Sequence, residues 1–414
     1  MLTLYGDGIH DDTRALQERI DGAGCELALP APKVRYRISA PLELPSRFRL
    51  TLPRFAEIWL APGSNCVMLK NKTRLDHANR GSGGIFDYVN AFSPDAFCED
   101  IEVSGGIWNA NNLGQAPNPM LIPLGDGNYT WGAAPKPRLS DAGDGSYDYT
   151  GFIFLFYAVR GLRLSSMTLK DPVTFAVMLD RVSDFTVDHI TFDFNYGNPR
   201  ACNMDGIHLN GGCCRGYIAD LKGACFDDLV ALNADEGIGS PIHDIVIRGI
   251  HAEDCHSAVR LLSANHAVRN VHISDVFGTF FQYAIGLTRF YESKDRGLLE
   301  NITLENLFVS KAPKLPVYNH NFPGEWEYAV IHADSRLSIR NLRISNLHRR
   351  EQVTPLPTLY FSSDTVIERL FLENITTENL TGGGTMPLLE NHAELRGFHA
   401  AALYEDGKPF IPAL

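Results

Sequence analysis

The sequence has 414 residues, of which 44% are hydrophobic and 21% charged, and its formal net charge is −12. This composition is typical of a soluble protein with a large core. The acidic balance argues against a polyanion-binding surface spread over the whole chain, so nucleic acid is not an expected partner. Every apolar run falls short of the roughly 18 residues that span a membrane, so we also expect no membrane partner.

The N-terminal stretch MLTLYGDGIHDDT lacks a charged segment followed by an apolar one. We therefore expect a cytoplasmic protein, unless a signal peptide has been removed. The eight cysteines are too few for a disulfide scaffold, and their spacing does not fit metal knuckles. We expect no cofactor and no metal, and we interpret Cys202 and Cys225 as small apolar core residues.

Residues 1–24 predict a helix that caps one end of the fold. Asp11 or Asp12 is suited to the N-cap, and an apolar face follows at Ala15, Leu16 and Ile20. The phrase Asp-Gly-Ile-His-Asp-Asp-Thr before such a helix resembles the N-terminal cap of the pectin-lyase-like superfamily of right-handed parallel β-helices. The resemblance implies an all-β fold with a short capping helix.

Short alternating apolar runs from residue 25 to residue 71 predict strands. Further along, Gly105-Gly106-Ile107-Trp108 resembles a Gly-Gly-x-Trp coil of the same superfamily, and Trp108 either stacks on a sugar or packs in the core. Residues 113–150 are rich in proline and glycine and show no strand periodicity. A long loop of this kind favours a wall of a substrate cleft, to which its aromatic residues would contribute: Tyr129, Trp131, Tyr147 and Tyr149.

From residue 151 to about 380 one pattern recurs with starts 23 to 40 residues apart: an alternating apolar segment, a two-residue polar turn and another apolar residue. A second short strand precedes each copy. Such a period predicts stacked coils of one elongated β-helix domain over residues 1–414, because each repeat contacts only its neighbours. Alternate residues of the second strand should point inward, as at Val177, Ile207, Val230 and Val259.

Two neighbouring copies carry a distinctive addition. The segments 202–210 and 225–233 align without a gap and bring Asp205 into register with Asp228, about 4.8 Å apart if the coils stack. Two carboxylates so close cannot both ionise cheaply, which suits a shared nucleophilic water. Asp227 points differently and would be the acid that protonates the leaving oxygen. The alternative is that these aspartates only make turn hydrogen bonds.

Asn203-Met204-Asp205 and Asp227-Asp228 resemble, in order, the Asn-Thr-Asp and Asp-Asp motifs of glycoside hydrolase family 28, the polygalacturonases. This resemblance covers about residues 150–310 and implies inverting hydrolysis of pectin-derived (galacturonate-containing) or related oligosaccharides. It implies the same roles, with Asp227 as acid and the Asp205/Asp228 pair holding the water.

The family's Gly-His-Gly and Arg-Ile-Lys motifs match less closely. Both are compressed into Cys255–Leu262, where the repeat register places His256 over Asp227 and Arg260 over Ala231. In a second alignment, residues 284–289 are the counterpart of the fourth motif. In both alignments the lysine of the family is replaced, so its uronate-binding residues are only partly present.

Six residues are candidates for substrate binding: Asn203, His208, His256, Arg260, Arg289 and Trp326. His208 either contacts the sugar or is merely solvated on a polar face. Arg260 offers several donors to an anionic or hydroxyl-rich substrate. Trp326 either stacks on a sugar or packs as a loop aromatic on the body of the fold.

Two other functions compete with hydrolysis. A polysaccharide lyase on the same fold would bind calcium through Asp205, Asp227, Asp228 and Asp235 and use Arg260 as its base. A non-catalytic carbohydrate-binding β-helix, like a tailspike, would bind sugars without turnover. If the protein is a hydrolase, the loop 113–150 closing one end of the cleft favours exo-action. The sequence does not predict the oligomeric state.

Overall fold

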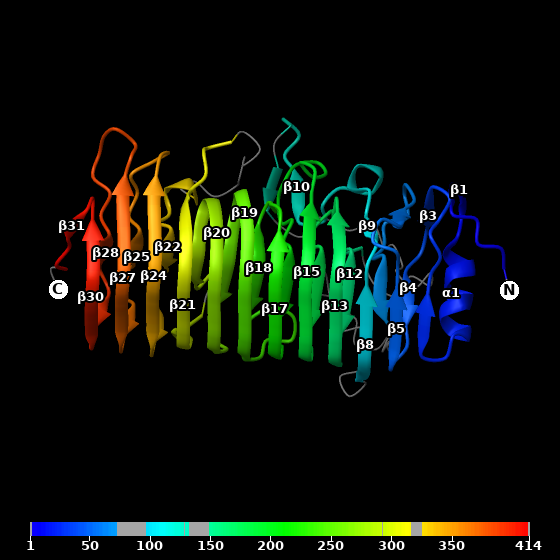
Figure 1. The fold of residues 1–414 in the computed structure, drawn as a ribbon, viewed down its shortest axis with the longest axis horizontal. Helices are drawn as coiled ribbons and strands as arrows, with labels where there is room; N and C mark the ends of the chain where they lie inside the picture. The colour runs from blue at the N-terminus through cyan, green and yellow to red at the C-terminus, as the bar shows by residue number, and fades with distance from the viewer. Residues whose placement is uncertain are drawn as a thin grey trace. The chain divides into compact units, whose positions relative to one another are not determined.

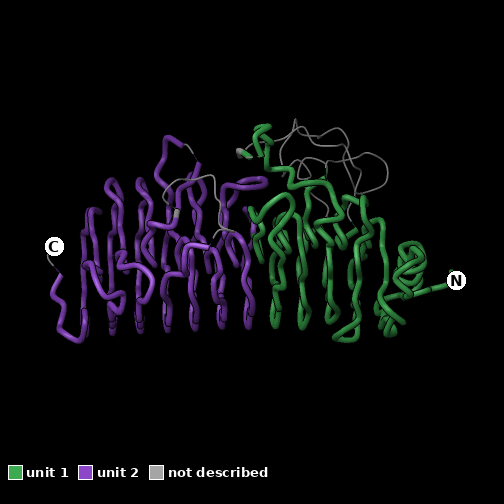
Figure 2. The backbone as a smooth tube through the Cα atoms, turned by 90° about the horizontal axis from the view of Figure 1, so that it is seen from above, with its two compact units in different colours: residues 1–208 green, residues 209–414 purple. Residues whose placement is uncertain are grey.

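The computed structural model describes residues 2–72, 97–127, 129–131, 149–291, 293–315 and 325–412. The chain folds into two compact units, residues 1–208 and 209–414 (Figure 2). Within each unit, strands of successive coils pair in parallel and build a right-handed parallel β-helix (Figure 1). The predicted fold class is confirmed, while the assignment of all 414 residues to one domain stays a prediction.

The strands are mostly short and alternate along each coil. In the first unit they are β1 (Asp7–Asp11), β2 (Glu26–Ala28), β3 (Arg35–Ile38), β4 (Leu42–Leu44), β5 (Phe48–Thr51), β6 (Glu57–Leu60), β7 (Leu69–Asn71), β8 (Cys98–Ser104), β9 (Ile107–Asn109), β10 (Leu121–Pro123), β11 (Tyr129–Trp131), β12 (Phe154–Tyr157), β13 (Val159–Lys170), β14 (Val177–Asp180) and β15 (Ser183–Asp193). β16 (Ile207–Asn210) contains the boundary of the units.

In the second unit, two strands, β19 (Ile242–Leu262) and β20 (Val268–Thr288), are 21 residues long. Each of them contains two strand segments that are separate strands in other coils. The strands of this unit are β17 (Cys214–Lys222), β18 (Asp228–Asn233), β19 (Ile242–Leu262), β20 (Val268–Thr288), β21 (Gly297–Lys311), β22 (Ile331–Ala333), β23 (Leu337–Ile339), β24 (Leu342–Glu351), β25 (Leu359–Phe361), β26 (Val366–Ile367), β27 (Leu370–Asn379), β28 (Leu389–Asn391), β29 (Glu394–Leu395), β30 (Phe398–Glu405) and β31 (Lys408–Pro409). Two 3-10 turns, η2 (Asn112–Gly114) and η3 (Glu325–Glu327), complete the elements described in the two units.

The helix α1 (Thr13–Gly22) buries the predicted face of Ala15, Leu16 and Ile20. Its N-cap is Asp12, but the Asp12 side chain does not cap the helix. Its carboxylate instead accepts hydrogen bonds from the backbone N–H groups of Tyr5 and Gly6. Asp12 therefore ties the chain before β1 to the start of the helix.

Inward-facing side chains form continuous apolar ladders. In the second unit one ladder pairs five residues of successive coils at equal register, each with no exposed surface: Ile247, Ile273, Leu304, Ile344 and Leu372. Burial of each such side chain stabilises the fold by about 1.5–3 kcal/mol. The predicted inward residues Val177, Ile207, Val230 and Val259 are likewise fully buried. All the remaining residues of β14, β16 and β18 are buried too, so burial does not show the predicted alternation in these strands.

The predicted polar turn of each coil is a left-handed corner. Asp275, Asn306, Asn346 and Asn374 all have positive φ between 52° and 57°. Short polar side chains tolerate this region better than others. The Asn306 amide donates to Asp275 Oδ1 at 3.0 Å, and Asn346 and Asn374 extend the same ladder. The residue type therefore satisfies the turn and links the coils.

The structure decides one open alternative of the first unit and changes one expectation. Trp108 is fully buried and its Nε1 donates to the carbonyl oxygen of Gly105, so the core interpretation holds. The segment 113–150 contains an antiparallel pair, β10 with β11, where no strand was predicted. Tyr149 is buried and donates to the Ala116 carbonyl, so it supports the loop from inside. Tyr147 lies outside the described residues.

Within the described residues, no helix combines the length and the apolar character needed to cross a membrane.

Candidate functional site

The predicted aspartates belong to different units: Asp205 to the first, Asp227 and Asp228 to the second. Their meeting on one patch stays a prediction. In the first unit Asp205 lies shortly before β16 and is buried, and its Oδ2 is 2.7 Å from His208 Nδ1. The His208 ring stacks on Phe175 at 4.1 Å. His208 is itself buried, so the expectation of a solvated histidine is wrong.

Asn203, two residues before Asp205, is also buried and has a φ of 53°. An asparagine tolerates this left-handed conformation at low cost, so Asn203 can turn the chain directly before the Asp205 position. Its role in substrate binding stays a prediction.

In the second unit the predicted register is confirmed. Val230 pairs with Val259 and Ala231 with Arg260 across β18 and β19. Parallel pairing at equal register sends side chains of neighbouring strands to the same side, so Arg260 projects from the coil next to the Asp227-Asp228 segment.

Arg260 is held against both aspartates. Its Nε lies 3.0 Å from Asp228 Oδ2, and its Nη2 lies 3.8 Å from Asp227 Oδ1. The Asp228 side chain is fully buried, whereas that of Asp227 is 15% exposed. Burial disfavours the charge on Arg260, but Asp228, Tyr283 and Asp227 together outweigh it and hold the pKa of Arg260 well above its usual range. Arg260 therefore acts as the counter-ion of Asp228 first and of Asp227 second.

Tyr283 completes this arrangement and was not predicted from the sequence. Arg260 Nε donates to the Tyr283 hydroxyl at 2.9 Å, and this hydroxyl lies 3.5 Å from Asp228 Oδ1. Tyr283 is fully buried, and burial raises the pKa of its hydroxyl well above the usual value. The phenol is thus a neutral group that joins the guanidinium to the carboxylate.

Gly286 explains how the tyrosine ring reaches this place. Gly286 follows Arg260 in the same column of the sheet, and a Cβ there would lie 2.4 Å from the Tyr283 ring. Gly286 belongs to residues 284–289, the alternative counterpart of the Arg-Ile-Lys motif. The sequence shows this glycine, but its spacing does not show that the ring of Tyr283 packs against it.

The substitution Gly286→Ala is expected to destabilise the fold by about 1–3 kcal/mol, because the added methyl group displaces a buried ring in a packed region. Gly383→Ala is the matched control, since an added Cβ at Gly383 meets no atom within 4 Å. Urea unfolding of both variants measures the difference. Equal midpoints would show that the ring of Tyr283 is not confined.

His256 is buried beside Asp227. Its Nδ1 lies 3.1 Å from Ser257 Oγ and 3.7 Å from Asp227 Oδ1, and its ring stacks on Phe281 at 5.6 Å. Burial lowers the pKa of His256 to about 4, against the raising effect of Asp227. The imidazole is therefore neutral at neutral pH and adds no positive charge to the centre.

Lys311 supports this region from behind and was also not predicted. It is fully buried, and its Nζ donates to the carbonyl oxygens of Phe281, Gln282 and Tyr328. Burial lowers the pKa of Lys311 well below its usual value. The amino group thus fixes the backbone that carries Phe281 and Tyr283.

The remaining candidates and Asp235 all have protein contacts. Arg289 Nη2 donates to the carbonyl oxygens of Ser293 and Asp295. Trp326 Nε1 donates to the Ala312 carbonyl at 3.2 Å, which fits the packing interpretation. Asp235 accepts from the backbone N–H groups of residues 264–266 and lies 2.8 Å from His266 Nδ1. Asp235 therefore closes a corner loop.

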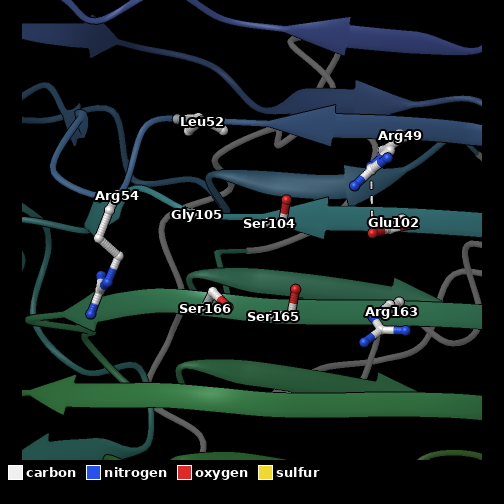
Figure 3. A pocket seen from close by; sticks show the side chains of 9 residues that line it. All are labelled: Arg49, Leu52, Arg54, Glu102, Ser104, Gly105, Arg163, Ser165 and Ser166. Atoms are coloured by element: carbon white, nitrogen blue, oxygen red, sulfur yellow. Dashed lines mark ion pairs between the residues drawn. The ribbon is translucent and has the colours of Figure 1, made fainter.

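A separate cavity of about 510 Å³ lies on the outer side of β5, β8 and β13 in the first unit (Figure 3). Arg49 and Glu102, which line it, form an ion pair at 3.5 Å. None of the predicted site residues lines this cavity. An exposed ion pair of this kind contributes only about 0–1 kcal/mol to stability.

No family model matches the sequence, and no curated protein does. Solved structures match in fold over almost the whole chain. An exopolygalacturonase from Thermotoga maritima is 16% identical, with a TM-score of 0.56 over 98% of this chain and 90% of its own. A family 28 exopolygalacturonase from Yersinia enterocolitica is 14% identical, with a TM-score of 0.52 over 98% and 78%.

The A-module of a mannuronan C-5 epimerase from Azotobacter vinelandii is 10% identical, with a TM-score of 0.55 over 97% of both chains. At these identities the likeness concerns the fold, which carries more than one chemistry. The chain is therefore similar in fold to polygalacturonases, including one of glycoside hydrolase family 28. This fold is the parallel β-helix that the sequence predicts.

Proposed function

We propose that this protein is a glycoside hydrolase of the polygalacturonase type, which acts with inversion on pectin-derived or related oligosaccharides. One observation carries the proposal: two adjacent aspartates differ in their surroundings. Asp228 is fully buried against Arg260 at 3.0 Å, whereas Asp227 is partly exposed and lies 3.8 Å from the same guanidinium. A pair of carboxyl groups with unequal environments divides into a base and an acid.

The guanidinium beside Asp228 favours its ionised form, which suits a base that takes a proton from water. Asp227 is farther from the positive charge and is partly exposed, which suits the acid that protonates the leaving oxygen. Asp205, expected in register with Asp228, would hold the same water. Inversion requires the acid and this water on opposite faces of the sugar.

The loop 113–150 and the fold likeness to two exopolygalacturonases favour removal of sugars from a chain end. The cytoplasmic location expected from the sequence accords with short substrates, and cell fractionation tests it.

The proposal is tested by NMR of the first product anomer from a panel of oligosaccharides. We expect the configuration to be inverted and single sugars to appear before the polymer shortens. Retention of configuration would refute the mechanism, and a rapid drop in polymer viscosity would refute exo-action.

The lyase alternative is less favoured because Asp235, one of its four calcium ligands, is already committed to the backbone of residues 264–266. An unsaturated product absorbing in the ultraviolet would establish it. The non-catalytic alternative requires that sugars bind and are not cleaved.

A further inference from the structure

We propose that the cavity lined by Arg49, Arg54 and Arg163 in the first unit is a second sugar-binding site, which takes a carboxylate group of an acidic sugar chain. The cavity contains none of the residues to which a part in hydrolysis is assigned above. The inference concerns binding alone, so it goes beyond the proposed function and does not depend on it.

The register of three successive coils orders the lining of this cavity. Ser104 pairs with Ser165 across β8 and β13, and two residues earlier Glu102 pairs with Arg163. Arg49 pairs with Glu102 across β5 and β8. Residues two apart on a strand point to the same face. A row of hydroxyl groups therefore lies beside a row of charged groups, as Figure 3 shows.

The guanidinium groups of the charged row are held only loosely. Arg49 Nη1 lies 3.8 Å from Glu26 Oε1, and Arg49 Nε lies 3.5 Å from Glu102 Oε1. Arg163 Nη2 lies 3.5 Å from Asp188 Oδ2. These separations exceed the roughly 2.7–3.2 Å of an N–H···O hydrogen bond. The N–H groups of both arginines can therefore turn to a ligand without breaking a strong contact.

Arg54 lies on the other side of the serines from this charged row (Figure 3). Its Nη1 donates to Thr168 Oγ1 at 3.0 Å, and among the described residues it forms no ion pair. The side chains that line the cavity include three guanidinium groups and one carboxylate, that of Glu102. The lining itself therefore carries a net positive charge, which favours an anionic ligand.

The serine hydroxyls add donors between the arginines. Within the part of the chain that the structure describes, the hydroxyls of Ser104, Ser165 and Ser166 form no hydrogen bond. Ser165 is only 8% exposed, so its hydroxyl has little access to solvent outside the cavity. An ionised carboxylate has only acceptor oxygens, and guanidinium and hydroxyl groups can both donate to it. The lining thus matches the chemistry of a carboxylate.

The space along the same face favours a chain over a small ion. The cavity of about 510 Å³ is within the range of roughly 300–1,000 Å³ for small-molecule sites. A second cavity of about 600 Å³ shares Arg49, Glu102 and Arg163 with it. This second lining has equal numbers of basic and acidic residues: Arg47, Arg49, Arg163, Asp100, Glu102 and Asp184. A sugar chain can place a carboxylate in the first cavity and its hydroxyls, which both donate and accept, in the second.

The test is calorimetric titration of the full chain carrying Asp227→Asn, so that no probe is cleaved. The probes are an oligogalacturonide, its fully methyl-esterified form and inorganic phosphate. We expect the oligogalacturonide to bind at least about tenfold more tightly than the ester, because charge-assisted hydrogen bonds are lost with the carboxylate. Raising the ionic strength from about 0.01 M to about 0.15 M should weaken binding of the acid. Binding of phosphate alone, or of no probe, would overturn the inference.

Variants assign the binding to this cavity rather than to the Asp227–Asp228 centre. The double substitution Arg54→Ala/Arg163→Ala should weaken one oligogalacturonide binding event at least about tenfold, and Ser165→Ala should weaken it about threefold. Arg343→Ala is the matched control, because Arg343 is 50% exposed and pairs with one acid, as Arg163 does at 55%. Unchanged affinity in the double variant, or an equal loss in Arg343→Ala, would overturn the inference.

Hydrolysis is measured separately, with Asp227 restored. The double variant should cleave a short neutral substrate at the unaltered rate, because that substrate lacks the group that the cavity binds. A chain that cleaves no sugar would refute the proposed hydrolase, and the titrations would still decide whether the cavity binds an acidic sugar chain.

Discussion

Asp227→Asn is expected to reduce kcat/KM for oligosaccharide hydrolysis by about 10³-fold, within the 10²–10⁴-fold range of a general acid. Asparagine has nearly the same volume but has no proton of suitable acidity for the leaving oxygen. The Asp227 side chain is 15% exposed and lies 3.8 Å from Arg260, so this exchange removes chemistry with little change in packing. Initial rates of reducing-sugar release measure the effect.

A substrate with an activated leaving group, such as a p-nitrophenyl glycoside, needs less protonation. For such a substrate the loss in Asp227→Asn should be clearly smaller than for the natural linkage. A uniform loss on both substrates would assign Asp227 to another role, and full activity would exclude it as the acid.

Asp275→Asn provides the matched control. Asp275 lies in β20 on the outer side of the fold, where it pairs with Arg248 at 3.0 Å and accepts a hydrogen bond from Asn306. Asparagine preserves the positive φ of this corner, so hydrolysis should be unchanged. Near-ultraviolet circular dichroism of both variants verifies that the fold is retained.

Glu351→Ala is expected to lower the free energy of unfolding by about 3–5 kcal/mol, the range for breaking a buried ion pair. Glu351 and Arg349 have no exposed side-chain surface, and Glu351 Oε2 lies 2.6 Å from Arg349 Nη2. The same carboxylate accepts from the backbone N–H groups of Lys311, Val353 and Thr354. Its removal leaves a buried guanidinium and three backbone donors without their partner.

Glu373→Ala is the comparison, because Glu373 pairs with Arg343 and both side chains are about half exposed. A surface pair of this kind contributes about 0–1 kcal/mol. Urea unfolding followed by circular dichroism should therefore show a large shift for Glu351→Ala and almost none for Glu373→Ala. Equal shifts would show that water reaches the Arg349–Glu351 pair.

Much of the candidate site in the second unit was predictable, because the β-helix repeats one register. Once Val259 is aligned with Val230, the position of Arg260 over Ala231 follows from strand pairing, and the pairing in the structure agrees. The partners of Arg260 did not follow. Tyr283 depends on the space above Gly286, and Lys311 depends on backbone carbonyls at residues 281, 282 and 328.

His208 shows the same limit in the first unit. Alternation along a strand predicts which face of the strand a side chain lies on, and it placed His208 on a polar face. It does not predict what covers that face. In the structure the Phe175 ring stacks on His208, and Asp205 Oδ2 lies 2.7 Å from His208 Nδ1.

The sequence by itself determined the parallel β-helix, its capping helix, the inward ladders and the polar corners. These features follow from the repeat, because residues at the same position of successive coils stack on one another and are of similar type. Only the tertiary structure decided what surrounds Arg260 and the Asp227–Asp228 pair. Tyr283 bonds to Arg260, and Lys311 fixes the backbone next to Tyr283. Arg260, Tyr283 and Lys311 come from three different coils, and the loops between coils vary in length, so these contacts depend on packing that no periodicity encodes.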